Sequence, residues 1–394
     1  MRVLVVDTYY EPMLREHYAE RPGLEARTYA EQHASLMARC FGTADAYSRG
    51  LRALGHQAAE VVANCAPLQR RWAAERGIGL RSRLAGATDR LPGAARRRLE
   101  RGWLGRVLAA QVAAHDAEVV YVQDMHALAR PELDALRAAG RLVAGQIASP
   151  PPDDEVIRGY QLVVTSFPHF VERFRALGVE SEYLPLAFPE TVTERLAERG
   201  VSTRPQAPRP YRLAFVGALD PHVHPRGFAL LEYVARVEPM EVWGYGVERA
   251  PRDSPLRRSW RGQAWGLEMY GVLARSRVVL NRHIDAAEGH ANNMRLFEAT
   301  GAGAALVTEQ SPNLADLFES DREVATYRDE HEAVAVVRRL LGDDDERRRI
   351  ASAGQVRTLR DHTYSRRMPA LAELLEARLA GRSAEVTRRG RPDG

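Results

Sequence analysis

Residues 290–309 read HANNMRLFEATGAGAALVTE, and this stretch decides the fold of the second half of the chain. Asn292 and Asn293 are of the residue type that caps the start of a helix, and the glycines further along are typical of a helix end. Ala304–Thr308 then predicts a short buried strand. A helix that leads directly into a buried strand is characteristic of an α/β layer.

Glu298 lies on the first turns of this expected helix, close to the N–H groups that a helix start leaves free. Free N–H groups at a helix start bind anions such as phosphate, and a nearby carboxylate can accept hydrogen bonds from ribose hydroxyls. The segment therefore predicts a nucleotide site. An α/β layer without a ligand has the same pattern, so both interpretations stay open at this point.

The composition is that of a globular protein with room for two domains. The chain has 394 residues, 45% of them hydrophobic, and contains no apolar run of the length that spans a membrane. It starts with a strand-like segment and not with a signal peptide. A bridge between its two cysteines, Cys40 and Cys65, stays open, but a reducing cytoplasm is the simpler setting. We expect a cytoplasmic protein, and attachment at a membrane surface is left open.

The chain contains no lysine, so all 56 basic residues are arginine. This excludes a Walker A phosphate loop, a lysine Schiff base and lysine-linked biotin or lipoate. Any phosphate held by a cationic side chain is therefore held by the planar guanidinium group of arginine.

Residues 68–106 carry eleven arginines against three acidic residues. The usual interpretation of such a segment is a solvated helical face. The alternative is a basic flap for an anionic partner, such as a polyanionic acceptor, a membrane surface or nucleic acid. Trp72 and Trp103 are too few to indicate base stacking, so we expect no specific nucleic acid partner.

Apolar strands alternate with helices in both halves of the chain, which predicts mainly parallel sheets with helices on both faces. We expect a Rossmann-like, doubly wound domain over residues 1–190, a proline-rich linker over 191–210 and a second such domain over 211–380. The terminal helices are expected to pack back on the first domain, and residues 381–394 to be disordered. Two such domains bring the ends of both sheets around one cleft, where a ligand would bind.

Candidate site residues of the second half follow its expected strands. Gly217 allows a close approach of backbone to a ligand, and Arg226, at a helix start, suits a phosphate. Gly244 lies in a bare GYG turn that suits a flat base or is an ordinary tight turn, and His283 follows another strand. These positions predict one wall of a ligand site.

Metal binding is not expected. The histidines of the PHVH segment, His222 and His224, have no evident third ligand, and the acidic run 343–345 precedes a helix that it more readily caps. The chain also lacks the GxGxxG, HExxH and GxSxG motifs.

The first half offers fewer candidates. Its first strand ends in a polar loop at Asp7 and Thr8, and Asp124 and His126 follow a later strand. Asp124 and His126 form a candidate acid–base pair, although surface residues of a loop have the same pattern.

Several segments carry a family resemblance. In the second half these are NNMRLFEATGAGAALVTE (292–309), PNLADLFE (312–319), EVATY (323–327) and RDHTY (360–364). In the first half they are FGTADAYSRGLRALGHQ (41–57), NCAPLQRRWAAERG (64–77) and YLPLAF (183–188). The chain resembles the glycosyltransferases related to spore maturation protein CgeB, which are akin to group 1 glycosyltransferases. That family has the GT-B architecture, with two Rossmann-like domains facing a central cleft.

The resemblance implies transfer of a sugar from a nucleotide diphosphate sugar, with the donor on the C-terminal domain and the acceptor on the N-terminal one. Glu298 matches the glutamate that holds the ribose hydroxyls, and residues 293–295 match the start of the diphosphate helix. GT-B enzymes usually need no metal, because helix N–H groups and a cation stabilise the departing diphosphate. The nucleotide-sugar-binding positions expected here are Gly217, Arg226, Gly244, His290, Asn293, Met294, Arg295 and Glu298.

One position departs from the family. Group 1 enzymes place a second glutamate eight residues before the ribose glutamate, where it contacts the donor sugar. Here that position is His290, and Glu288 lies two residues further away. The donor sugar and the retaining or inverting outcome therefore stay open. Asp124, His126 and His283 are the catalytic candidates.

The expected function is metal-independent glycosyl transfer to a glycan, lipid carrier, protein or natural product. One alternative is a nucleotide-sugar epimerase or hydrolase on the same fold, which would turn over the donor without an acceptor. Another is a non-catalytic nucleotide-sugar-binding protein, which would bind through Glu298 without turnover.

Overall fold

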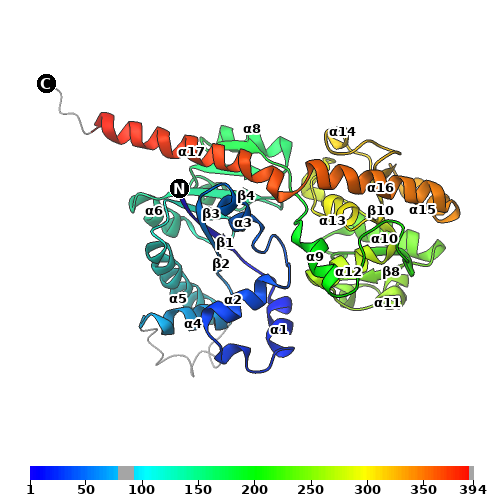
Figure 1. The fold of residues 1–394 in the computed structure, drawn as a ribbon, viewed down its shortest axis with the longest axis horizontal. Helices are drawn as coiled ribbons and strands as arrows, with labels where there is room; N and C mark the ends of the chain where they lie inside the picture. The colour runs from blue at the N-terminus through cyan, green and yellow to red at the C-terminus, as the bar shows by residue number, and fades with distance from the viewer. Residues whose placement is uncertain (79–92, 390–394) are drawn as a thin grey trace.

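The computed structural model describes residues 1–78 and 93–389. Its two halves each contain a parallel β-sheet flanked by helices, and the halves lie side by side (Figure 1). The expected fold class, two doubly wound α/β domains, is confirmed.

Among the described residues, six parallel strands form the N-terminal sheet in the order β2-β1-β3-β4-β5-β6. They are β1 (Arg2–Asp7), β2 (Gln57–Val62), β3 (Val119–Val122), β4 (Leu142–Ile147), β5 (Leu162–Thr165) and β6 (Glu180–Tyr183). Side chains alternate between the two faces of β1, and both faces are buried. Val3 and Val5 pack into one core cluster and Leu4 and Val6 into another, which explains the continuous apolar run of this strand.

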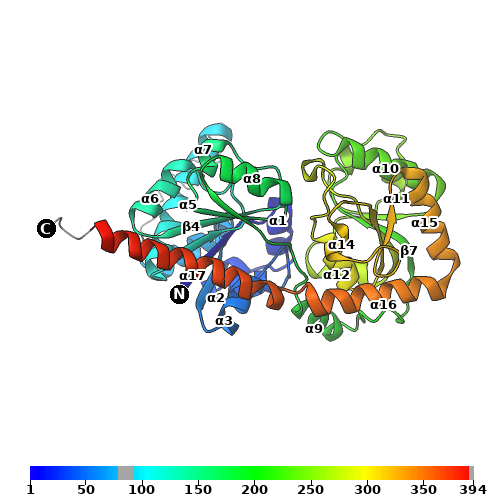
Figure 2. The same cartoon turned by 90° about the horizontal axis from the view of Figure 1, so that it is seen from above.

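Helices cover both faces of the N-terminal sheet (Figures 1 and 2). The helices in the first part of this half are α1 (Glu11–Ala19), α2 (Tyr29–Met37), α3 (Ala46–Ala53), α4 (Ala66–Glu75), α5 (Gly93–Ala114), α6 (Arg130–Ala138), α7 (Asp154–Ile157) and α8 (Pro168–Ala176). The arginine-rich segment 68–106 includes parts of α4 and α5, and its residues 79–92 lie outside the described part of the chain.

In the C-terminal half, the described strands have the order β11-β10-β9-β7-β8, all parallel. They are β7 (Tyr211–Val216), β8 (Glu241–Trp243), β9 (Ser276–Leu280), β10 (Ala305–Glu309) and β11 (Ala325–Tyr327). The helices of this half are α10 (Pro225–Val237), α11 (Pro255–Ser259), α12 (Leu267–Ala274), α13 (Arg295–Gly301), α14 (Leu314–Leu317), α15 (Glu330–Gly342) and α16 (Asp344–Asp361).

Two segments connect the halves. The span 191–210, expected to be a linker, includes helix α9 (Thr191–Glu198), whose Val192 and Leu196 are buried one turn apart. The last helix, α17 (Tyr364–Arg389), crosses from the C-terminal half and lies along the N-terminal one (Figures 1 and 2). Its residues Tyr364, Met368 and Leu371 are buried in the core cluster that also contains residues of β1 and α3.

Helix α17 also includes residues 381–389, where the sequence predicted disorder, and residues 390–394 lie outside the described part. Cys40 and Cys65 are buried free thiols, so no bridge joins them. Within the described residues, no helix is both long and apolar enough to cross a membrane.

Candidate functional site

Loops at the carboxyl ends of the two sheets touch each other. Tyr10 follows β1, and its ring meets that of Tyr245, which follows β8, edge-on with the ring centroids 5.8 Å apart. His169 lies at the start of α8 and stacks on His290, which precedes α13, at 4.9 Å. Ligands of parallel α/β sheets bind at these ends. The candidate residues of the two halves therefore belong to one region of the molecule.

Glu298 lies within α13 and is only 5% exposed. Its Oε2 atom is 2.7 Å from Nη1 of Arg295, one turn earlier in the same helix, and its Oε1 accepts a hydrogen bond from the Tyr270 hydroxyl at 3.3 Å. A buried carboxylate needs such partners, because an unpaired buried charge is costly. Two oxygens with one protein partner each retain lone pairs that can accept bonds from ligand hydroxyls.

Arg295 also connects α13 to the end of β7, because its Nη2 atom donates to the carbonyl of Val216 at 3.1 Å. The next residue, Gly217, is packed backbone to backbone against Gly244: a Cβ atom on residue 244 would lie 1.7 Å from the Gly217 carbonyl oxygen. Gly244 also has a φ of 141°. Glycine at 244 is therefore required by the contact between the β7 and β8 loops, whatever ligand the turn faces.

The expected caps of α13 do not form. Met294 is the N-cap residue, with no side-chain capping bond. Asn293 instead donates from Nδ2 to Asn281 Oδ1 and to the Arg282 carbonyl, both at 2.9 Å, which fastens it to the loop after β9. Asn292 is 3% exposed, and neither of its amide atoms has a partner among the described residues. A side-chain cap joins residues that are neighbours in sequence, so that residue spacing can predict it. Asn281 lies twelve residues before Asn293, so the spacing did not indicate that these two side chains bond.

His283 is buried behind the same loops. Its main-chain N–H donates to Glu309 Oε2 at 2.8 Å. Burial lowers the pKa of its imidazole to about 4, and the nearby Arg282 guanidinium acts in the same direction. The ring is therefore neutral at neutral pH, and its low proton affinity makes it a poor general base. Burial also raises the pKa of Glu309.

Arg226 and His290 have different surroundings. Arg226 is exposed at the start of α10, where the N-cap residue His224 makes no side-chain capping bond. His290 is bound through Nδ1 to the Ala287 carbonyl at 3.1 Å and stacks on His169 of the other half. The position eight residues before Glu298 thus lies where the two halves meet.

Asp124 and His126 are close in sequence, but their side chains do not form the expected acid–base pair. The Asp124 carboxylate accepts from the main-chain N–H of His126 at 3.0 Å and from the Thr8 hydroxyl at 2.5 Å. The His126 imidazole is exposed and bonds the Pro150 carbonyl at 3.0 Å. The partner of Asp124 is thus the loop after β1.

Asp7, which was not among the candidates, lies at the end of β1 beside Asp124. Burial raises the pKa of its carboxyl to about 7, the Asp124 carboxylate acts in the same direction, and the Thr8 N–H bond opposes them. The polar residues that end the first strand were the available signal. The raised pKa of Asp7 depends in part on Asp124, which only the fold brings close.

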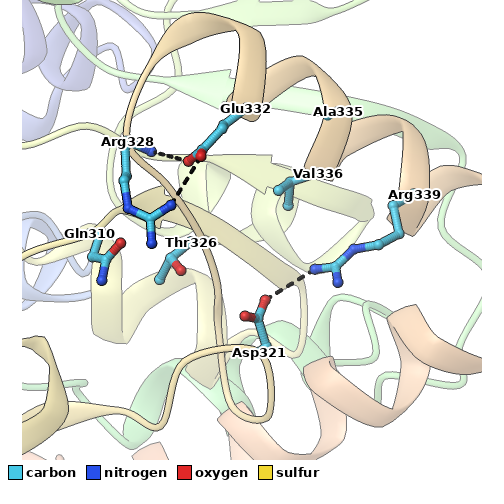
Figure 3. Close-up of a pocket in the computed structure, with 8 residues that line it drawn as sticks. All are labelled: Gln310, Asp321, Thr326, Arg328, Glu332, Ala335, Val336 and Arg339. Atoms are coloured by element: carbon cyan, nitrogen blue, oxygen red, sulfur yellow. Dashed lines mark hydrogen bonds and ion pairs between the residues drawn. The ribbon is translucent and has the colours of Figure 1, made fainter.

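A surface pocket of about 360 Å³ lies elsewhere, between β11 and α15 (Figure 3). Its charged residues already form pairs, Arg328 with Glu332 at 3.0 Å and Arg339 with Asp321 at 3.0 Å. It contains none of the candidate site residues. Among the side chains that the structure describes, no group of three or more His, Cys, Asp and Glu residues is placed to hold a metal ion.

Known proteins share this architecture. The chain aligns over 97% of its length with all of sucrose-phosphate synthase from Thermosynechococcus elongatus, at 11% identity and a TM-score of 0.58. It aligns over 95% of its length with 99% of Anabaena HepE in complex with UDP-glucose, at 13% identity and a TM-score of 0.56. It also aligns over 96% of its length with 99% of a UDP-forming trehalose-phosphate synthase from Burkholderia vietnamiensis, at 12% identity and a TM-score of 0.55.

No curated protein matches the sequence significantly. Residues 227–373 match a family described as glycosyl transferase-like, and this range contains Glu298 and the whole of α13. The chain thus shares its two-domain fold with these proteins, and part of its C-terminal half is similar to a family described as glycosyl transferase-like.

Proposed function

We propose that the protein transfers a sugar from a nucleoside diphosphate sugar to an acceptor molecule, with the donor bound by the C-terminal half. The observation that carries this proposal is the buried Glu298, held by Arg295 and Tyr270 beside the contact between Gly217 and Gly244. In this arrangement Glu298 accepts hydrogen bonds from the ribose hydroxyls of the nucleotide. Anabaena HepE, which has the same fold, is described in complex with UDP and with UDP-glucose.

The diphosphate would lie between Arg226 and the segment from Asn293 to Arg295. Arg226 is exposed and has no hydrogen-bond or ion-pair partner among the described residues, so its guanidinium is available to a phosphate. Main-chain N–H groups and a cation can together stabilise the charge that develops on a leaving diphosphate. We therefore propose that the transfer requires no metal ion.

A thermal-shift panel of nucleoside diphosphates and their sugars tests this function. We expect at least one to raise the melting temperature of the wild-type protein, and the same ligand to have a smaller effect on the Glu298→Gln variant. The matched control is Glu319→Gln, which removes an exposed carboxylate from another arginine–glutamate pair spaced by three residues. A panel that leaves the wild-type melting temperature unmoved would overturn the proposed donor site.

A further inference from the structure

Thr8 joins two carboxylates at the carboxyl edge of the N-terminal sheet. Its main-chain N–H donates to Oδ1 of Asp7 at 2.8 Å, and its hydroxyl donates to Oδ2 of Asp124 at 2.5 Å. Asp7 ends β1, and Asp124 follows β3, the neighbouring strand. Both residues are half-buried.

The groups around Asp7 favour retention of a proton. Burial and the Asp124 carboxylate raise its pKa to about 7, and only the Thr8 N–H bond opposes them. Three tyrosines also interact electrostatically with Asp7, namely Tyr9 of its own loop, Tyr47 of α3 and Tyr364 of α17. Burial raises the pKa of each of these tyrosines, so all three are neutral near pH 7.

The space beside Asp7 is kept open by a glycine. Gly42 has a φ of 57°, and a Cβ atom added to it would meet Oδ2 of Asp7 at 3.9 Å and no other described atom within 4 Å. Any other residue here would be strained and would place its side chain next to this oxygen. The sequence thus leaves one oxygen of Asp7 accessible.

The carboxylate pair also lies near the proposed donor loops. Tyr10 is three residues after Asp7 and contacts Tyr245, the neighbour of Gly244. Gly244 packs on Gly217, which follows the residue that Arg295 binds. A continuous series of contacts therefore leads from the loop of Asp7 to Arg295 and Glu298.

We propose that Asp7 and Asp124 bind a hydroxyl group of the acceptor and take up the proton that this hydroxyl loses on transfer. The inference rests on the proposed function. In the step, a bond forms between the acceptor oxygen and the anomeric carbon of the donor sugar. The bond from that carbon to the diphosphate breaks, and its electron pair leaves with the nucleoside diphosphate. The hydroxyl proton passes to the Asp7 carboxylate, which Asp124 and Thr8 position. The acceptor class in this proposal is a hydroxyl compound.

The test measures UDP release from UDP-glucose, with water as the hydroxyl acceptor, and UDP binding by calorimetry. The variants are Asp7→Asn and Asp124→Asn, and the matched control is Asp134→Asn, a surface carboxylate paired with Arg130. Wild-type and control rates should rise with pH until about 7, since Asp7 must lose its proton to act as base. Asp7→Asn should lower the rate by roughly 100-fold or more and abolish this rise, while UDP binding is unchanged.

The melting temperature provides a second readout. Because the folded pKa of Asp7 is above the ordinary 3.8, its contribution to stability is lost as the pH rises from 3.8 to about 7. The Asp7→Asn variant should therefore become more stable relative to wild type as the pH rises over that range. Its cooperative melting curve also shows that the variant folds.

Three results would overturn the inference while leaving donor binding intact. They are an Asp7→Asn variant with the wild-type rate and pH profile, an Asp7→Asn melting curve with the wild-type pH dependence, and a wild-type protein that binds UDP but releases none from UDP-glucose. Loss of UDP binding in Asp7→Asn would place the residue in the donor site and also contradict the inference. A wild-type protein that binds no UDP would instead count against the proposed function with this donor.

Discussion

Arg295 and Glu298 form an ion pair of 2.7 Å inside one short helix, and both side chains are largely buried. The same guanidinium group donates to the main chain at the end of β7, so the pair fixes α13 against the neighbouring strand. Glu298 is thus placed by its own helix, and its position does not depend on a bound ligand.

Removal of one partner should destabilise the protein. Glu298→Ala leaves the buried Arg295 without its carboxylate, and we expect the free energy of unfolding to fall by about 3 kcal/mol. Glu298→Gln retains an acceptor for Tyr270 and Arg295 and should cost less. Urea denaturation of both variants and of Glu319→Gln measures this. Equal stability of the alanine variant and wild type would mean that the pair does not exist in solution.

Gly244→Ala tests the contact between the loops after β7 and β8. The new methyl group would overlap the Gly217 carbonyl oxygen, whereas at Gly262, also at positive φ, no atom lies within 4 Å of an added Cβ. Both substitutions impose backbone strain, but only the first imposes a clash. We expect Gly244→Ala to cost about 1–3 kcal/mol more than Gly262→Ala in chemical denaturation. A smaller loss at 244 than at 262 would contradict the packing described.

The buried His283 should make stability depend on pH. Its pKa is lowered to about 4 from the ordinary 6.5 by burial, so below pH 6.5 the unfolded chain binds a proton that the folded protein does not. The free energy of unfolding should therefore be greatest above pH 6.5 and fall as the pH falls toward 4. The loss attributable to His283 is about 2 kcal/mol at pH 5. In denaturation series across this range, His283→Gln should flatten the dependence, and the exposed His331→Gln should not. Parallel curves for wild type and His283→Gln would refute this assignment.

Metal removal should leave the reaction unchanged. The proposed charge stabilisation comes from Arg226 and main-chain N–H groups, so UDP release from UDP-glucose should have the same rate after EDTA treatment as with added Mg²⁺. Activity that disappears with EDTA and returns with Mg²⁺ would show that the diphosphate needs a cation beyond the arginines. Arg226→Ala should in either case weaken UDP binding.

The fold was predictable because its signals are local. The apolar β1 and the alternation of strands with helices indicate parallel sheets without knowledge of distant contacts. Because 191–210 is proline-rich, it was predicted to be a linker, and helix α9 was not predicted there. The one signal for this helix is the spacing of Val192 and Leu196 by one helical turn.

The site was only partly predictable because its side chains choose partners across the chain. Asn293 resembles a helix cap in sequence but bonds Asn281. Asp124 was paired by proximity with His126, yet the side chain that reaches its carboxylate is Thr8, which lies 116 residues earlier in the chain. The proton affinity of Asp7 depends on its burial and on Asp124, so nothing in its own segment reveals it.

The most direct measurement of the central claim is calorimetric binding of UDP to wild type, Glu298→Ala, Glu298→Gln and the Glu319→Gln control. If Glu298 accepts hydrogen bonds from the ribose, wild type and control bind alike. Both Glu298 variants then bind more weakly, the alanine variant by about 1–3 kcal/mol, because buried polar partners lose their bonds. Unchanged affinity of folded Glu298 variants, as judged by their unfolding curves, would contradict the account and remove Glu298 from the donor site.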